Sequence, residues 1–386
     1  MSVEDVRRRN LGEILRRIHE EGPQSRARLT AATGLNRSTT ADLVATLVEA
    51  GVAVERDPDP TRRVGRPSPV VAARDDVVAI AVNPEVDAVE LAAVGLNGQL
   101  AVRAREELDH LLTPAELAQR VAATLRGWRA GALANARVVG VGIAVPGLVR
   151  ASDGVVRLAP HLEWTDAAVG ALVEDATGLP VAVGNDASLG ARAEHLFGAA
   201  RGHDDVVYLN GGASGIGGGL IVEGHLLGGA GGYAGEWGQN HAVIDHEADR
   251  RSATGILEDE VSRSRLLEAL GLTVADDATL AAAVAGATDR DVQDELARQR
   301  RLLVGTLASA VNVLNPSAIV LGGFLSMILA ADPDGLTDAV RARAMSAPAE
   351  GVQILPAALG DDRLLIGAAE AAFAALLADP LLVVPA

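Results

Sequence analysis

The stretch DVVYLNGGASGIGGGLIVEGHLLGG, residues 205–229, decides how the larger part of this chain folds. Two apolar runs in it flank a glycine-rich centre, which is the pattern of two strands joined by a bend. Outward from this stretch, further strand-like runs alternate with helical patterns; they cover residues 77–82, 88–98, 137–145, 180–186 and 315–323. This alternation predicts an α/β body of two lobes with a cleft between them.

Composition narrows the class of protein. The chain has 386 residues, enough for two or three domains, and 49% of them are hydrophobic but only 2% aromatic. No apolar run approaches the roughly 20 residues that a membrane helix needs, and the first ten residues lack the apolar core of a signal peptide. There is no cysteine, which excludes disulfides and thiolate metal ligands. We therefore expect a cytoplasmic protein that does not enter a membrane.

Charge is distributed unevenly along the chain. The net charge is −17, and lysine is absent, so that arginine supplies the positive charge. Residues 1–70, however, hold 12 arginines and only 10 acidic residues. An acidic body disfavours nonspecific binding of nucleic acid, whereas a slightly basic segment suits a DNA-facing module. The asymmetry predicts a small DNA-binding segment attached to an acidic body.

Three helical patterns fill the first fifty residues. Apolar residues recur at helical spacing over residues 11–20 and again over residues 25–35. A short break that contains glycine separates the second pattern from a third helix, for which Asn36 has the side chain of an N-cap. A strand pattern over residues 52–56 and a proline-rich turn follow. This order predicts a winged helix-turn-helix domain over residues 1–72.

Polar residues at the start of the third helix are of the types that contact phosphates and base edges in a major groove. The turn after the strand is basic, and Arg66, between Gly65 and Pro67, resembles the arms that place an arginine in a narrow minor groove. The predicted DNA contacts are Arg26, Asn36, Arg37, Ser38, Thr39, Thr40, Arg62, Arg63 and Arg66. The alternative is a three-helix protein-interaction domain with a basic loop. Because one such module binds DNA weakly, we expect a dimer on paired half-sites.

Five segments carry a resemblance to a known family. They are GIAVPGLV (142–149), APHLEW (159–164), GNDASLGA (184–191), SGIGGGLIVEGHLLGGAGGYAGEWG (214–238) and NPSAIVLGG (315–323). With the winged helix they resemble the ROK family (repressor, open reading frame, kinase) of the sugar-kinase/actin-like superfamily, in its branch of xylose and N-acetylglucosamine regulators. The resemblance implies a homodimer or homotetramer that binds a double-stranded DNA operator and responds when a sugar or sugar phosphate closes the cleft.

The same resemblance divides the body into lobes. It implies a first lobe over residues 73–200, to which the C-terminal helix at about residues 365–386 returns, and a second lobe over residues 201–364.

Kinases of this family carry an Asp-x-Gly-Gly-Thr turn between their first two strands. Here the turn falls on residues 83–87, where Asn83 replaces the aspartate, Glu85 a glycine and Asp87 the threonine. Carboxylates then stand where backbone N–H groups would approach phosphate. Asp186 matches the catalytic aspartate and is expected to be vestigial. The prediction is a regulator that is not an enzyme; the alternatives are an ATP-dependent carbohydrate kinase that keeps a DNA-binding domain, and a scaffold whose N-terminal unit binds protein.

The resemblance also suggests where an effector would bind. Sugar-facing roles fall on a set of acceptors suited to vicinal hydroxyls, in which a glutamine stands for the family's histidine and a histidine for its usual asparagine. The predicted ligand-binding residues are His161, Asn185, Asp186, Glu236, Gln239 and Glu258. A non-sugar ligand and a regulator without any ligand remain alternatives.

Residues 235–258 take the place of the family's zinc-binding segment. The histidine and three cysteines that hold zinc in the family fall on Gln239, Asp249, Arg251 and Ile256. Structural zinc takes four nitrogen or sulfur ligands, so we expect no metal or other cofactor here. His241 and His246 are expected to be solvated. We expect salt bridges to hold the loop, for instance from Arg250 or Arg251 to acidic neighbours.

Overall fold

A computed structural model describes residues 2–56 and 69–382 of the chain. Its contacts divide the chain into two compact units. The first unit comprises residues 1–149, 154–184 and 365–386, and the second comprises residues 150–153 and 185–364. Within the described ranges, no helix is long and apolar enough to cross a membrane.

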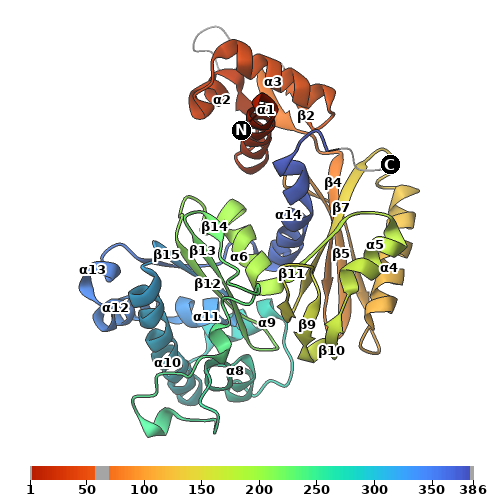
Figure 1. Ribbon diagram of the computed structural model, residues 1–386. Coiled ribbons are helices and arrows are strands. Elements are labelled where there is room, and N and C mark those ends of the chain that lie inside the picture. Colours follow the sequence, from red (N-terminus) through yellow and green to blue (C-terminus); the bar gives the residue numbers. More distant parts are fainter. Residues whose placement is uncertain (1, 57–68, 383–386) are drawn as a thin grey trace. The chain divides into compact units, whose positions relative to one another are not determined.

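The N-terminal segment of the first unit is a winged helix-turn-helix, as predicted (Figure 1). Its helices are α1 (Val3–Glu20), α2 (Arg26–Thr33) and α3 (Arg37–Glu49), and its strands are β1 (Gln24–Ser25), β2 (Ala53–Arg56) and β3 (Val70–Ala73). The strands pair antiparallel in the order β1-β3-β2. Helix α1 begins eight residues before the apolar pattern, because Ser2 and Asp5 form a capping box at its start.

The remainder of the first unit is built on a five-stranded sheet. In the order β11-β7-β4-β5-β6 its strands are Val181–Asn185, Arg137–Val145, Val77–Pro84, Ala88–Gly95 and Leu100–Glu107. Two helices that pack on each other, α4 (Pro114–Arg129) and α5 (Val169–Thr177), contribute to the same apolar core. A three-stranded sheet of β8 (Leu148–Val149), β9 (Val156–Ala159) and β10 (Trp164–Ala167) completes the unit.

The second unit has a five-stranded sheet of its own, in the order β14-β13-β12-β15-β16. Its strands are, in that order, His225–Leu226, Ile216–Val222, Val206–Gly211, Ala318–Gly323 and Gln353–Pro356. The helices are α6 (Asp186–Phe197), α7 (Leu257–Glu260), α8 (Arg263–Ala269), α9 (Asp277–Gly286), α10 (Arg290–Leu314), α11 (Phe324–Ala331), α12 (Pro333–Arg343) and α13 (Ser346–Ala349). The stretch 205–229 therefore forms the expected pair of strands, since β12 and β13 are a hairpin.

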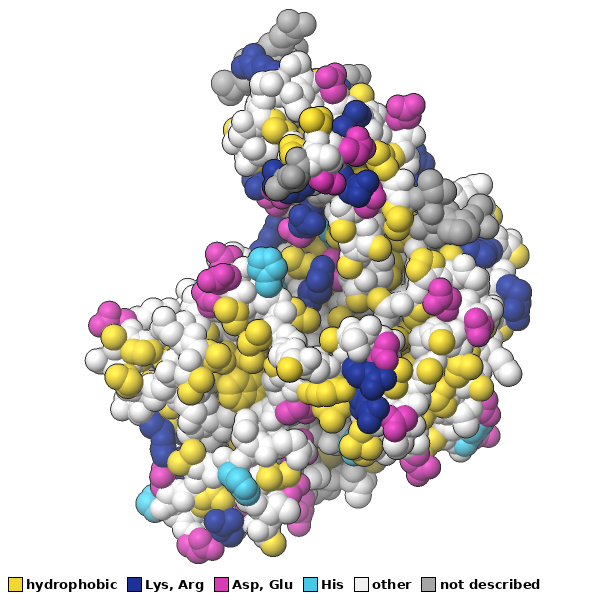
Figure 2. Space-filling model, viewed as in Figure 1, with side chains coloured by type: hydrophobic (Ala, Val, Ile, Leu, Met, Phe, Trp, Pro, Cys, Tyr) yellow, Lys and Arg dark blue, Asp and Glu magenta, His cyan; other side chains and the backbone are white. Residues whose placement is uncertain are grey.

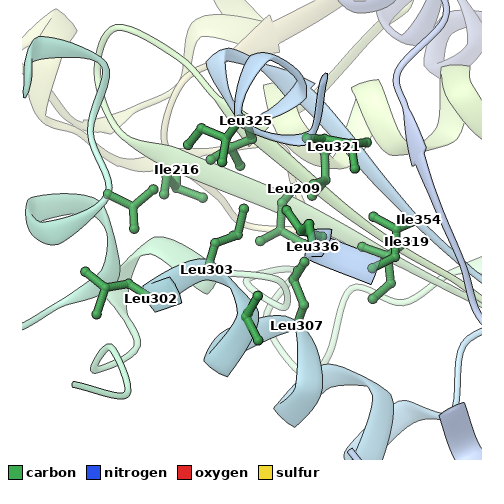
Figure 3. Packing of buried hydrophobic residues seen from close by; sticks show 14 of the residues in the cluster. Leu209, Ile216, Leu302, Leu303, Leu307, Ile319, Leu321, Leu325, Leu336 and Ile354 are labelled. Carbon is green, nitrogen blue, oxygen red and sulfur yellow. The ribbon is translucent and has the colours of Figure 1, made fainter. Parts of the chain in front are cut away.

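A large apolar core lies between α10 and this sheet. Figure 3 shows Leu303 and Leu307 of α10 gathered with Leu209 of β12 and Leu321 of β15, and all four side chains are fully buried. Burial of each such side chain stabilises the unit by about 1.5–3 kcal/mol. This core anchors α10 to the sheet through its apolar face.

The boundaries of the lobes differ from those expected. The contact boundary falls between Gly184 and Asn185 rather than after residue 200, because α6 packs on β12 and β13 and so belongs to the second unit. The winged helix-turn-helix does not separate as a unit at residue 72 either. Its helix α1 packs against α14 (Arg363–Ala378), which returns to the first unit as the resemblance implied.

A buried histidine joins α1 to α14. The Nε2 of His19 lies 2.8 Å from an oxygen of Glu370, and its Nδ1 lies 2.6 Å from the carbonyl oxygen of Leu96. Burial alone would lower the pKa of His19, but the charge of Glu370 and the hydrogen bonds to Glu370 and Leu96 outweigh it and raise the pKa. Glu20 adds to the same effect. Both ring nitrogens therefore donate when the imidazole is charged.

We expect this contact to make stability depend on pH. Because the folded pKa of His19 is raised, its contribution is complete below the ordinary value of about 6.5 and is lost as pH rises through the folded pKa. His19→Gln should lower the free energy of unfolding, on the order of 3 kcal/mol at pH 5.5, and by less at pH 8.5. Urea unfolding of both proteins across this range checks it, with His241→Gln as the surface control. A difference that stays constant with pH would contradict the charged-pair assignment.

Candidate functional site

The start of α3 is the candidate surface for DNA. Asn36 caps the helix, since its Oδ1 accepts the N–H of Thr39 at 2.9 Å and the hydroxyl of Ser38 at 2.7 Å. Arg37 and Ser38 are exposed, so their side chains are available to a groove. Thr40 is only 1% exposed and its hydroxyl bonds the carbonyl of Asn36 at 3.1 Å. The prediction that Thr40 contacts DNA is therefore corrected: it lies on the buried face of α3.

The other arginines predicted to contact DNA are either ion-paired or outside the described residues. Arg26 is ion-paired with Glu55 of β2 at 2.5 Å, so it ties α2 to the first wing strand. Arg62, Arg63 and Arg66 lie outside the described residues.

The candidate effector site begins where β11 ends and α6 starts. The Oδ1 of Asn185 accepts the N–H of Ser188 at 2.8 Å and caps α6, while its Nδ2 lies 3.2 Å from Asp186. Burial raises the pKa of Asp186 to about 6, against the opposing effects of the N–H of Ala187 and the charge of Arg363. A strand end therefore presents an amide and a carboxyl that titrates near neutrality.

Glu258 of α7 reaches the hairpin of β12 and β13. One of its oxygens accepts the N–H of Ile216 at 3.2 Å, and the other accepts from Nε2 of Gln239 at 2.5 Å. Gly215, at a φ of +145°, leaves the space for it, because a Cβ there would lie 2.5 Å from Glu258. The glycine at position 215 is thus explained by the close approach of a carboxylate.

Two carboxylates of this region act on a third carboxyl group. The pKa of Glu236 is raised, first by burial and then by the negative charges of Asp186 and Glu258. Five of the six predicted ligand residues belong to the second unit: Asn185, Asp186, Glu236, Gln239 and Glu258. They form a set rich in hydrogen-bond acceptors, which suits a ligand with several hydroxyl groups. The sixth, His161, is an exposed residue of the first unit.

Sequence reasoning missed Arg363, at the start of α14. Its charge lowers the pKa of both Asp186 and the buried Tyr208, although burial raises both overall. Nothing in the sequence near residue 363 indicates this role, because Asp186 precedes it by most of the second unit.

The turn that follows β4 is held by side chains of β4 and β6. Nδ2 of Asn83 donates to Glu85 at 2.9 Å, and Glu85 is ion-paired with Arg105 at 2.9 Å. Burial raises the pKa of Glu85 despite that arginine. Glu90, on the next strand, is 6% exposed and paired with Arg103 at 2.7 Å. Glu85 of the turn is therefore already engaged by Asn83 and Arg105.

The loop of residues 235–258 does not fit a metal. Within the described ranges, no group of three or more histidine, cysteine, aspartate or glutamate side chains could hold one. His241 and His246 are exposed, Asp245 is paired with Arg343 at 2.5 Å, and Asp249 with Arg301 at 2.7 Å. Such pairs are common in this chain, and Figure 2 shows arginine and acidic side chains interspersed over one face.

The expected salt bridges of the loop are present in part. Arg250 is paired with Glu247 at 3.2 Å. Arg251 bonds backbone carbonyls through its side chain, and it meets Glu260 only through its backbone N–H. Further ion pairs join the loop to Arg301 of α10 and Arg343 of α12, which sequence reasoning did not identify.

Two family profiles match the chain. The IclR helix-turn-helix domain matches residues 10–58, and the ROK family matches residues 80–374. The chain belongs to the ROK family. It is a DNA-binding transcriptional regulator with a sugar-kinase-like sensing domain.

This ROK protein is similar both to transcriptional regulators and to a sugar kinase. The xylose repressor of Bacillus subtilis (strain 168) is 26% identical, over 94% of each chain. A glucokinase of Streptomyces coelicolor is 31% identical over 55% of this chain and 72% of the kinase. A crystal structure of a ROK family transcriptional regulator, a homolog of the E. coli MLC protein, superposes with a TM-score of 0.79 at 22% identity, over 98% of each chain. The last likeness shows that the whole fold is shared.

We expect Arg37 to be a principal DNA contact of this ROK protein. Arg37→Ala should lower operator affinity and change sequence preference, because a bidentate arginine contact discriminates bases by about 1–3 kcal/mol. Fluorescence anisotropy with the protein's own upstream DNA, at fixed salt, measures this. Arg129→Ala, at the end of α4, removes the same charge elsewhere in the first unit and is the control. Equal affinity of the two variants would refute the placement of α3 in a groove.

Proposed function

We propose that this protein is a transcriptional repressor that binds operator half-sites as a homodimer or homotetramer, and whose DNA affinity changes when a carbohydrate binds the second unit. The observation that carries the proposal is the acceptor set of Asn185, Asp186, Glu236 and Glu258 in a chain that also has a helix-turn-helix. The xylose repressors among its relatives support it.

The charges of the set favour a neutral sugar over a sugar phosphate. The negative charges of Asp186 and Glu258 both raise the pKa of Glu236, while the charge of Arg363 acts on Asp186 in the opposite direction to burial. A phosphate that joined three carboxyl groups would be repelled by about 3 kcal/mol per charge at 5 Å and an effective dielectric near 20. Hydroxyl groups instead donate to such oxygens, and Gln239 adds a neutral amide.

The effector class can be tested by thermal shift against pentoses, hexoses and their phosphates. We expect neutral sugars to raise the melting temperature, because a ligand that binds only the folded state at 100 times its Kd stabilises by about 2.7 kcal/mol. Glu258→Gln should abolish the shift, while Glu268→Gln, an exposed glutamate nearby in sequence, should retain it. Stabilisation by the phosphates and not by the free sugars would overturn the neutral-sugar assignment.

Kinase activity is the second candidate function, because Asp186 is retained and has a pKa near 6, which suits a general base. Against it stands the β4–β5 turn. A phosphate cradle needs free N–H groups and a positive potential, whereas this turn places Glu85 and Asp87 there, with Glu85 already bound by Asn83 and Arg105. We infer that the protein senses a sugar without phosphorylating it.

A coupled ATPase assay over a panel of pentoses and hexoses separates the two functions. We expect the wild-type protein to show no sugar-dependent turnover above that of Asp186→Asn, since nothing in the turn holds the nucleotide phosphates. Turnover that disappears in Asp186→Asn would show that the chain is a kinase.

A further inference from the structure

Glu258, which the proposed effector site requires, lies on a helix that is too short to be stable by itself. Helix α7 is four residues long, Leu257–Glu260, and an isolated helix of that length is unstable in water. Its first residue, Leu257, is buried in the apolar core. Burial of Leu257 fixes how close α7 lies to the core, but it does not fix the direction of the next side chain. The direction of Glu258 must therefore be set by polar contacts.

The last residue of α7 supplies the first of these contacts. Glu260 is 0% exposed, and its carboxylate accepts the N–H of Arg251 at 2.9 and 3.1 Å and the N–H of Ser252 at 2.9 Å. A buried carboxylate thus ties the returning loop to α7. It would be unstable there without a positive partner.

That partner is Arg298 of α10, which is 2% exposed. Its Nη1 donates to the carbonyl of Asp249 at 2.9 Å and to the carboxylate of Glu260 at 3.4 Å, and its Nη2 donates to the carbonyl of Glu260 at 2.7 Å. Nε and Nη2 donate to Glu295 at 2.8 and 2.7 Å. The five contacts match the five N–H groups of a guanidinium.

We propose that Arg298 is a positioning residue for the effector site, and that its network with Glu260 and Glu295 holds α7 and the loop of residues 249–252 so that Glu258 meets Ile216 and Gln239. This inference rests on the proposed function in one respect, namely that the site of Glu258 binds an effector. The placement of Glu258 follows from the contacts alone.

The network also offers a way to hold this loop that needs no metal. The family resemblance implies zinc in this segment, but Arg251 and Ile256 stand at ligand positions and Asp249 is bound by Arg301. A metal fixes a loop by binding side chains from several places at once. Arg298 does the same with two backbone carbonyls and two carboxylates, so the loop is fixed without metal.

Two neighbouring polar residues, Glu295 and Gln299, support this role of Arg298. Burial alone would raise the pKa of Glu295, but hydrogen bonds from Arg298 and Gln299 keep it below its ordinary value. Gln299, which is fully buried, also donates to the carbonyl of Ser262 at 3.1 Å. The core between α10 and the sheet keeps these donors in place.

Hydrogen–deuterium exchange of the full-length protein tests the proposal without any ligand. In Arg298→Lys, which keeps the charge but has three donors in place of five, exchange in residues 214–218 and 236–258 should be on the order of tenfold faster. Exchange in α3 and operator affinity should not change. Arg290→Lys, an exposed arginine of the same helix, is the matched control and should exchange like the wild type. A chelator should have no effect on the wild-type loop.

Three outcomes would overturn the proposal: unchanged loop exchange in a folded Arg298→Lys protein, an equal change in Arg290→Lys, or faster loop exchange of the wild type with chelator. Should Arg298→Lys fail to fold, Glu295→Gln weakens one arm of the network and should accelerate the same segments by less. Calorimetry with D-xylose and D-glucose then separates the two proposals. If neither sugar binds the wild type, the effector assignment fails while the exchange result still decides the role of Arg298.

Discussion

The close approach of the α14 backbone to its neighbours is the constraint on which the first unit depends. A Cβ on Gly142 of β7 would lie 1.8 Å from the carbonyl oxygen of Ala368, and a Cβ on Gly12 of α1 would lie 2.7 Å from that of Leu377. Neither position can carry a side chain without moving α14. The same helix therefore supports strand β7 of the sheet and the first helix of the DNA-binding domain. At this contact His19 and Glu370 add a polar, directional bond to shape complementarity.

Much of this arrangement could be predicted from local patterns. The strand at residues 137–145, the hairpin at residues 206–222 and the helix that Asn36 caps follow from periodicity and capping, which act over a few residues. The partner of Gly142 could not be predicted, because Ala368 lies more than two hundred residues further along the chain. Residue type misassigned Thr40, since it is polar but shares the buried face of α3 with Leu43 and Leu47, whereas Arg37 and Ser38 are exposed.

For the candidate effector site, too, only part of the arrangement could be predicted from the sequence. Asn185, Asp186, Glu236 and Glu258 were proposed from the family resemblance, and in the structure the charges of Asp186 and Glu258 raise the pKa of Glu236. What holds Glu258 could not be found by motif. The ion pairs of the loop join residues 249–260 to α10, some forty residues away, and a sequence pattern gives no register for such pairs. The expected salt bridge of Arg250 lies within the loop, whereas Arg298 and Arg301 reach residues 249–260 from α10, which no local pattern could indicate.

A chain that relies on arginine alone for positive charge has a physical advantage at this position. A buried ion pair contributes little net stability, since desolvation offsets most of the attraction. The geometry that such a pair requires, however, is specific. Five donors in one plane accept only one arrangement of the carbonyls of Asp249 and Glu260 and the two carboxylates around them. An apolar side chain at 298 would fill the same space but leave the carboxylate of Glu260 buried without a charge partner, and the loop would then have several ways to reach water. The geometry of Glu258 is therefore better explained by the specificity of the network than by its strength.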